Sequence, residues 1–148
     1  MKKLVFILFS LLTMFLGSCS NKSDDIYLGG GDPCEISSND VSIRKEKESY
    51  YIDVPAGGKD FSITVDNYPG WNISSISTQK SDKGEFNLVY NSGQKKEAKD
   101  KDWYEFSEIG NKVNCSIKQN SLLTTRTIEL VMITGDVACH IYIRQTAE

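Results

Sequence analysis

Residues 127–145 read TIELVMITGDVACHIYIRQ, and this stretch decides the class of fold. From Cys139 to Ile143, a cysteine and two isoleucines alternate with histidine and tyrosine. A period of two is typical of a strand with one face on a core and the other in water. Thr127–Ile133 is a second strand candidate, and the turn signal Gly135-Asp136 separates the two segments.

The same alternation recurs earlier in the chain, most clearly in Phe61–Val65 and Val113–Ile117. The other strand candidates are Val41–Arg44, Ser49–Val54, Trp71–Ile76, Phe86–Tyr90 and Trp103–Phe106. Short strands at this spacing predict an all-β fold, an antiparallel β-sandwich of one domain over residues 39–148. The charged segment Gln94–Asp102 departs from the pattern and is either a short helix or a polar loop.

The composition excludes several classes of function. The chain has 148 residues, a net charge of −3, 25% charged and 39% hydrophobic residues. This balance argues against a disordered chain and, without a basic excess, against nucleic acid as a partner. His140 is the sole histidine, and no nucleophile elbow, metal motif or phosphate loop is present. We therefore expect no enzyme activity, no catalytic residue, no metal and no cofactor.

The N-terminal residues have the pattern of a secretory signal. Two lysines precede an apolar run from Leu4 to Leu16, which is too short to span a bilayer. The run ends in Leu16-Gly17-Ser18-Cys19, which resembles the lipobox of bacterial lipoproteins. The resemblance implies cleavage after residue 18, lipidation of Cys19 and membrane attachment through acyl chains. The alternatives are an ordinary signal peptide with an incidental cysteine, or a buried helix.

Residues 19–38 form the predicted tether. They are poor in apolar residues and contain Gly29-Gly30-Gly31 and Asp32-Pro33, which are linker signals. Lys22, Asp24 and Asp25 resemble the export signal of Bacteroidetes surface lipoproteins, although Ser23 interrupts the match. The resemblance implies an outer membrane lipoprotein exposed at the cell surface. A tether that is merely acidic is the alternative.

A further set of residues resembles the BACON domain of Bacteroidetes. The set runs over residues 55–146 and comprises Gly57-Gly58, Trp71, Trp103, Asn120, Arg126 and the terminal strand ending in Gln145. The two tryptophans are 32 positions apart, whereas the family has them close together, so residues 78–101 are interpreted as an insertion. The resemblance implies an immunoglobulin-like sandwich that binds carbohydrate, although such modules also act as spacers.

Sugar binding requires exposed rings, because a ring face stacks on the apolar face of a pyranose. The candidates for glycan contact are Tyr68, Trp103, Tyr104 and Tyr142. Trp71 is interpreted as a core residue, because it shares its parity with Ile73. The predicted function is therefore a non-catalytic, lipid-anchored surface module that binds carbohydrate. The alternative is a structural, spacer or protein-interaction subunit of a surface assembly.

Three cysteines remain once Cys19 is lipidated, so at most one internal disulfide is possible. Cys115 and Cys139 both take inward parity, which makes them the candidate pair. Two buried thiols that behave as small hydrophobes are the alternative. A zinc site of Cys34, Cys115, Cys139 and His140 is not expected, because the close ligand pairs of such sites are absent.

Overall fold

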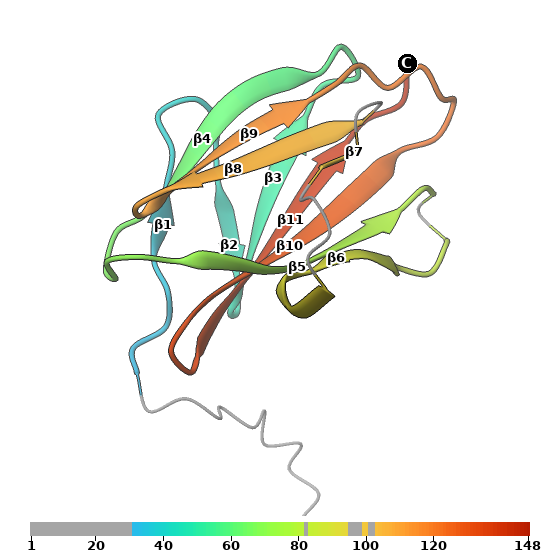
Figure 1. Cartoon of the computed structure of the whole chain (residues 1–148). Coiled ribbons are helices and arrows are strands. Elements are labelled where there is room, and N and C mark those ends of the chain that lie inside the picture. The colour runs from blue at the N-terminus through green and yellow to red at the C-terminus, as the bar shows by residue number, and fades with distance from the viewer. Residues whose placement is uncertain (1–30, 82, 95–98, 101–102) are drawn as a thin grey trace, which may run out of the picture.

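The computed structural model describes residues 31–148 except 82, 95–98 and 101–102, and this part of the chain forms two β-sheets (Figure 1). One sheet has the order β1 (Ile36–Ser37), β4 (Lys59–Val65), β9 (Lys112–Ile117), β8 (Tyr104–Ile109) and β7 (Lys99–Asp100). The other has the order β2 (Arg44–Glu46), β3 (Ser49–Val54), β11 (Val137–Gln145), β10 (Arg126–Thr134), β5 (Asn72–Gln79) and β6 (Asn87–Asn91). Among the described strands, β3 and β11 are parallel and the other paired strands are antiparallel.

The two sheets pack face to face as a β-sandwich around one hydrophobic core. Alternate residues of β4, β10 and β11 are buried along most of each strand. Ile63 from the first sheet and Ile52, Leu130 and Ile141 from the second are completely buried. Because alternate side chains point to opposite faces, the intervening residues of each strand form the two outer faces of the sandwich.

The alternation predicts most of the strands correctly. Ser49–Val54 has the bounds of β3, and Phe86–Tyr90 overlaps β6, which pairs with β5 as an additional strand. The prediction for Val41–Arg44 is largely wrong, because the strand begins only at Arg44. Val41 and Ile43 instead pack against the core from a non-strand segment, which explains their apolar character.

The charged segment from Gln94 to Asp102 is described only in part. Ser92–Gln94 forms a single 3-10 turn, η1, and Lys99–Asp100 forms β7. The remainder of the segment lies outside the described residues. The described part of the chain contains no helix with the length and apolar character of a membrane span.

The domain begins earlier than predicted, because residues 34–37 belong to the fold and not to a tether. Ile36 pairs with Val65 in the sheet, and Cys34 is buried. The segment lacks the apolar alternation of a strand, and it is held instead by hydrogen bonds and by a disulfide. The predicted signal peptide 1–18 and tether residues 19–30, including Cys19, Lys22, Asp24 and Asp25, lie outside the described residues.

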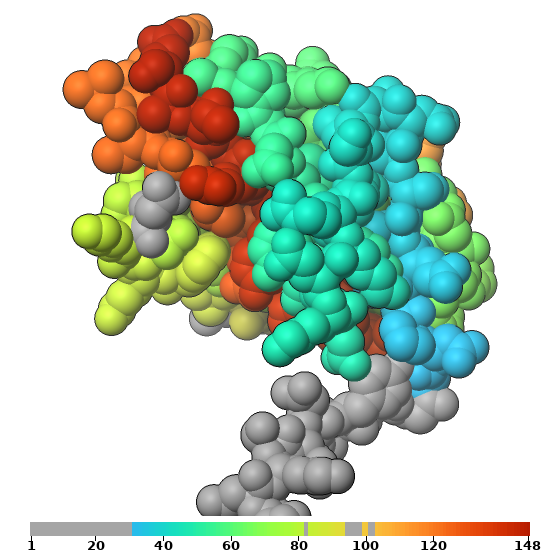
Figure 2. All heavy atoms as spheres, turned by 180° about the vertical axis from the view of Figure 1, so that it is seen from behind, coloured from blue at the N-terminus to red at the C-terminus, as the bar shows by residue number. Residues whose placement is uncertain are grey.

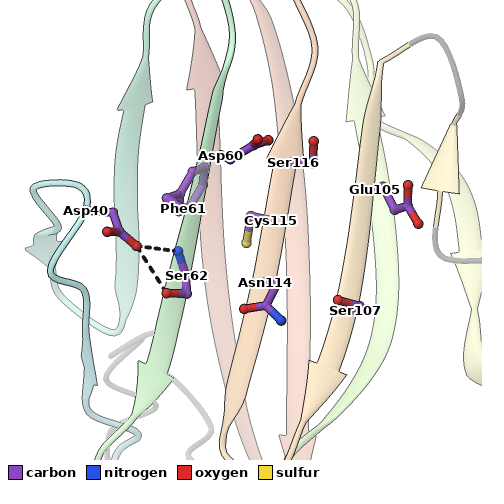
Figure 3. A pocket seen from close by; sticks show the side chains of 9 residues that line it. All are labelled: Asp40, Asp60, Phe61, Ser62, Glu105, Ser107, Asn114, Cys115 and Ser116. Carbon is purple, nitrogen blue, oxygen red and sulfur yellow. Dashed lines mark hydrogen bonds between the residues drawn. The ribbon is translucent and has the colours of Figure 1, made fainter.

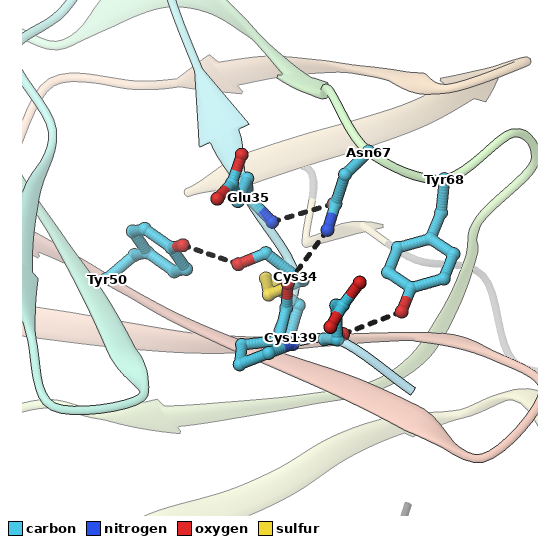
Figure 4. Close-up of a disulfide and its surroundings, with 8 residues drawn as sticks. Cys34, Glu35, Tyr50, Asn67, Tyr68 and Cys139 are labelled. Atoms are coloured by element: carbon cyan, nitrogen blue, oxygen red, sulfur yellow. Dashed lines mark hydrogen bonds between the residues drawn. A yellow bond between two sulfur atoms is a disulfide. The ribbon is translucent and has the colours of Figure 1, made fainter. Parts of the chain in front are cut away.

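The disulfide joins Cys34 to Cys139, so the predicted pairing of Cys115 with Cys139 is wrong (Figure 4). The two bonded residues have Cα atoms 5.8 Å apart, at the end of the sandwich where the chain enters. Cys115 lies on β9 of the five-stranded sheet, paired with Phe61 of β4 and Phe106 of β8, and it is a buried free thiol. Alternation within the strands correctly indicates that the Cys115 and Cys139 side chains point into the core. It does not indicate where along the length of the sandwich each of them lies.

Candidate functional site

Two of the four predicted glycan contacts are core residues. Trp103 is 4% exposed and Tyr104 is 2% exposed, so neither ring face is available to a ligand. The face of Trp103 carries the guanidinium of Arg126, whose central carbon lies 4.6 Å from the ring centroid. Trp103 precedes β8 and turns inward beside Tyr104 and Phe106, whereas strict alternation would place it on the opposite face. The prediction for these two residues is wrong.

Tyr68 is half-buried and holds the N-terminal segment in place. Its hydroxyl donates to the carbonyl of Asp32 at 2.7 Å, and its ring packs against Trp71 at right angles (Figure 4). The neighbouring Asn67 accepts from the backbone N–H of Glu35 and donates to the carbonyl of Pro33. These contacts give Tyr68 a structural role next to the disulfide.

Asn120, Arg126 and Gln145, which contribute to the family resemblance, meet in a buried polar network at the opposite end of the sandwich. Gln145 accepts from Arg126 Nε at 2.9 Å and donates to the carbonyls of Pro55, Ala56 and Lys118. Asn120 donates to the carbonyls of Thr124 and Thr146. This network ties strand ends and loops together, so these residues stabilise the fold.

Gly58 lies in the turn before β4 and packs against the backbone beside this network. Its φ is +85°, a conformation that favours glycine, and a side chain there would collide with the backbone of Ile117 and Lys118. The glycine is therefore required by close packing of two backbones.

Tyr142 is the predicted contact that faces outward. It is half-buried on β11, and its ring stacks on Tyr51 of β3 with centroids 5.2 Å apart and planes at 17°. Phe86 approaches it edge-to-face at 6.2 Å from the loop before β6. The Tyr142 hydroxyl donates to Glu129 Oε1 at 3.0 Å. Burial, and secondarily the adjacent Glu129 carboxylate, raise the pKa of Tyr142 to about 12.

The strand register extends this contact into a line across the six-stranded sheet. Opposite residues in successive strands are Arg44, Tyr51, Tyr142, Glu129, Ser77 and Leu88. We call these six residues the tyrosine row. Directly opposed residues share a face of the sheet, and their buried chain neighbours show that this face is the outer one. Figure 2 views the molecule from behind, with residues of β2 and β3 in teal and those around 80–88 in yellow-green.

Polar groups accompany the rings along the tyrosine row. His140 Nδ1 lies 3.3 Å from Glu129 Oε1, and 44% of the histidine side chain is exposed. At the β2 end, the Arg44 guanidinium lies over the Tyr51 ring, 5.4 Å from its centroid. The row thus combines apolar ring surface with groups that donate and accept hydrogen bonds.

A hollow of about 640 Å³ adjoins the Arg44 end of the row. We call it the β2 hollow. Its wall includes Arg44 and Tyr51 of the row, together with Asp53, Lys59 and residues 38–43, whose Ser38, Asn39 and Ser42 side chains are polar. This volume lies in the range of small-molecule sites, and the other described hollows are smaller.

The outer face of the other sheet carries a shallow polar groove of about 420 Å³ (Figure 3). Serine hydroxyls, the Asn114 amide and three carboxylates line it. Asp40 accepts from the backbone N–H and the hydroxyl of Ser62, and these bonds lower the pKa of Asp40. Phe61, the groove's aromatic residue, is buried, so the groove offers no ring face. Among the described residues, no group of three His, Cys, Asp or Glu side chains could hold a metal ion.

Sequence reasoning missed Tyr51, Phe86 and Arg44 as partners of Tyr142. The outward parity of Tyr51 was readable from Ser49–Val54, because Tyr50 and Ile52 alternate with it. The neighbourhood of Tyr51 and Tyr142 was not readable, because it depends on the parallel pairing of two strands about 90 residues apart in sequence.

Comparison with known proteins finds solved structures that are similar to this chain. No protein-family model and no curated protein matches the chain. An NMR structure of a protein from Bacteroides thetaiotaomicron matches with a TM-score of 0.60 at 19% identity, over 81% of this chain and 92% of that chain. The M1 domain from titin matches with a TM-score of 0.39 at 13% identity, over 66% and 90% respectively. At this identity the first likeness concerns the fold alone.

Proposed function

We propose that the chain is a non-catalytic, lipid-anchored surface module that binds carbohydrate through the outer face of the six-stranded sheet. The observation that carries the proposal is the tyrosine row, where Tyr51, Tyr142 and Phe86 lie beside Glu129 and His140. Sugars need both kinds of group, because their C–H faces pack on rings while their hydroxyls require hydrogen-bond partners. The adjoining β2 hollow adds further polar groups.

Anchoring and export are part of the same proposal. The Cys34–Cys139 disulfide supports an oxidising environment outside the cytosol, where such bonds form and persist. The signal peptide, the lipidated Cys19 and the export signal at Lys22, Asp24 and Asp25 remain predictions from sequence. Together these predictions support a location at the outer membrane, exposed to the medium.

The finer assignment of the fold is an immunoglobulin-like sandwich of BACON type. The strand orders β4-β9-β8 and β11-β10-β5-β6 support it, because they follow the B-E-D and G-F-C-C′ orders of immunoglobulin sheets. The parallel pairing of β3 with the last strand also agrees with this topology. The family assignment itself rests on the sequence resemblance.

A binding screen tests the proposed function. Full-length protein purified in detergent is probed with plant, host-mucin and bacterial polysaccharides. Tyr142→Ala is expected to weaken binding at least tenfold, whereas Tyr142→Phe, which keeps the ring, retains most of it. Ile109→Ala is the matched control, since Ile109 is an exposed apolar residue of the other sheet. Absence of binding to every polymer would contradict the proposal.

The second candidate function is a protein-interaction or spacer subunit. It is favoured by exposed apolar side chains at the β6 edge, where Phe86 is 40% and Leu88 56% exposed. An open edge strand is also a surface on which another chain can pair. Crosslinking on intact cells with a photoreactive residue at position 88 distinguishes the two candidates, because a protein partner gives a discrete adduct.

A further inference from the structure

The tyrosine row and the β2 hollow form one continuous binding surface. Arg44 and Tyr51 belong to both, so the hollow opens directly onto the first ring of the row. From β2 to β6 the row crosses six strands, which at about 4.8 Å per strand spacing is roughly 24 Å. A single sugar covers only a fraction of this length.

The far end of the row is built to continue such contacts. Leu88 exposes an apolar side chain there, and Ser77 and Glu129 lie between it and Tyr142 in the register. The Phe86 ring, from the loop before β6, instead contacts Tyr142. Apolar and hydrogen-bonding groups therefore recur along the whole line and are not gathered at one point.

Arg44, His140 and Lys59 on this surface already have acceptor groups as partners. Arg44 Nε lies 2.7 Å from Glu46 Oε1 and its NH1 lies 3.5 Å from Asp53 Oδ2. His140 lies beside Glu129, and Lys59 donates to the Asp40 carbonyl at 2.6 Å. This arrangement provides hydrogen bonds without an excess of positive charge, so it disfavours a polyanion.

We infer that the ligand is an uncharged carbohydrate chain of several sugars that lies across the strands, with one part in the β2 hollow and the rest along the tyrosine row, past Phe86 to Leu88. This inference rests on the proposed function. It makes chain length a determinant of affinity, because short sugars occupy the hollow and long ones also reach the distal apolar residues.

The experiment uses full-length protein in detergent and calorimetric titration with cello-, xylo-, manno- and chito-oligosaccharides of one to six units. Oligogalacturonides provide the acidic comparison. In a series that binds, affinity is expected to rise at least tenfold from the disaccharide to the hexasaccharide. The acidic series is expected to bind more weakly than that series.

Variants show which part of the surface provides the rise in affinity with chain length. Leu88→Ala is expected to weaken hexasaccharide binding far more than disaccharide binding, whereas Tyr51→Ala weakens both to the same degree. Ile109→Ala is the control for removal of an exposed apolar side chain. Circular dichroism verifies that each variant is folded.

Failure of this inference can be distinguished from failure of the proposed function. Affinity that is independent of length, a hexasaccharide advantage that survives Leu88→Ala, or preference for the acidic series would overturn the inference and leave carbohydrate binding intact. Lack of binding to any oligosaccharide or polysaccharide would overturn the proposed function itself, and a discrete protein adduct at position 88 would then favour the second candidate function.

Discussion

At the residue scale, Gln145 is the centre of the buried network that closes one end of the sandwich. Its side chain is 1% exposed, and it accepts from Arg126 and donates to three backbone carbonyls. Gln145→Ala leaves these buried groups without their partner, so we expect a loss of about 2–3 kcal/mol in the free energy of unfolding. Urea denaturation measures it.

Glu148→Ala is the control for this prediction. Glu148 is exposed at the same end of the molecule and accepts from Gln119. Its replacement should change stability by less than about 0.5 kcal/mol. If both variants unfold at the same urea concentration, the network does not stabilise the fold.

The buried thiol of Cys115 gives a second prediction at this scale. Burial raises the pKa of the Cys115 thiol far above its ordinary value of 9.0. Above that pH the unfolded chain loses the proton while the folded chain keeps it, so stability is lost as pH rises. At pH 10 the loss is about 1.4 kcal/mol relative to pH 8.

Cys115→Ala removes this contribution and isolates it from other alkaline effects. Tyr104 and Tyr142 also have raised pKa values of about 12, but their losses begin only near pH 10, the ordinary tyrosine value. The difference in unfolding free energy between the two proteins is therefore measured from pH 8 to pH 10. A difference that does not change with pH would contradict the prediction.

Tyr142, Tyr51 and Trp103 show how far the sequence predicts the direction of a side chain. Alternation identifies the outward position of Tyr142, and it equally identifies that of Tyr51. It misplaces Trp103, because this residue lies just before β8, where a turn and not the pleat sets its direction. Side-chain direction can be read inside regular strands and is lost at their ends.

At the scale of elements, the first strand depends on a covalent bond. β1 has two residues, and its segment is held by the Cys34–Cys139 disulfide and by the hydroxyl of Tyr50, which donates to the Cys34 carbonyl at 2.6 Å. We predict that Cys34→Ser lowers the free energy of unfolding by about 2–5 kcal/mol. The amide of Asp66, which directly follows β4 and donates to the Glu35 carbonyl at 2.8 Å, should then exchange faster with solvent, while those of β10 keep their protection.

Hydrogen exchange resolved by residue is the measurement, and Cys115→Ser serves as control. Cys115 forms no disulfide, so any loss in this control reflects packing of a hydroxyl in the core and not release of β1. Equal exchange of β1 and β4 in Cys34→Ser and the unmodified protein would show that the bond is not needed for their order.

The order of the elements shows why part of the fold escaped prediction. Strand positions follow from alternation within short segments, which is local information. The pairing of β3 with β11 and of Cys34 with Cys139 joins residues 90 or more positions apart, and nothing local specifies it. The bulge in the pairing of β5 with β6 is a further feature that the local sequence does not predict. It leaves Val89 without a partner in β5 and interrupts the regular pairing of an uncharged edge strand.

At the scale of the whole molecule, attachment to the membrane is expected to depend on Cys19. Each buried methylene contributes about 0.8 kcal/mol, so two or three acyl chains hold a protein durably. Cys19→Ala should abolish incorporation of labelled palmitate and release the protein from the membrane fraction. Unchanged labelling would contradict the lipobox interpretation.

Replacement of Lys22, Asp24 and Asp25 by alanine separates anchoring from display. This variant should keep its lipid and lose accessibility to an external protease on intact cells. Retained accessibility would show that these three residues do not direct the protein to the surface.

The position of the disulfide has a mechanical consequence for a protein that is held at its N-terminal end. Tension that enters the chain at Gly31 passes at Cys34 through the sulfur–sulfur bond into Cys139 of β11, and it bypasses the weak two-residue pairing of β1. Tyr142, in the tyrosine row, lies three residues further along the same strand. When flow pulls a bound ligand away from the membrane, the force would therefore pass through a few residues of one interior strand. The rest of the sandwich would carry almost none of it.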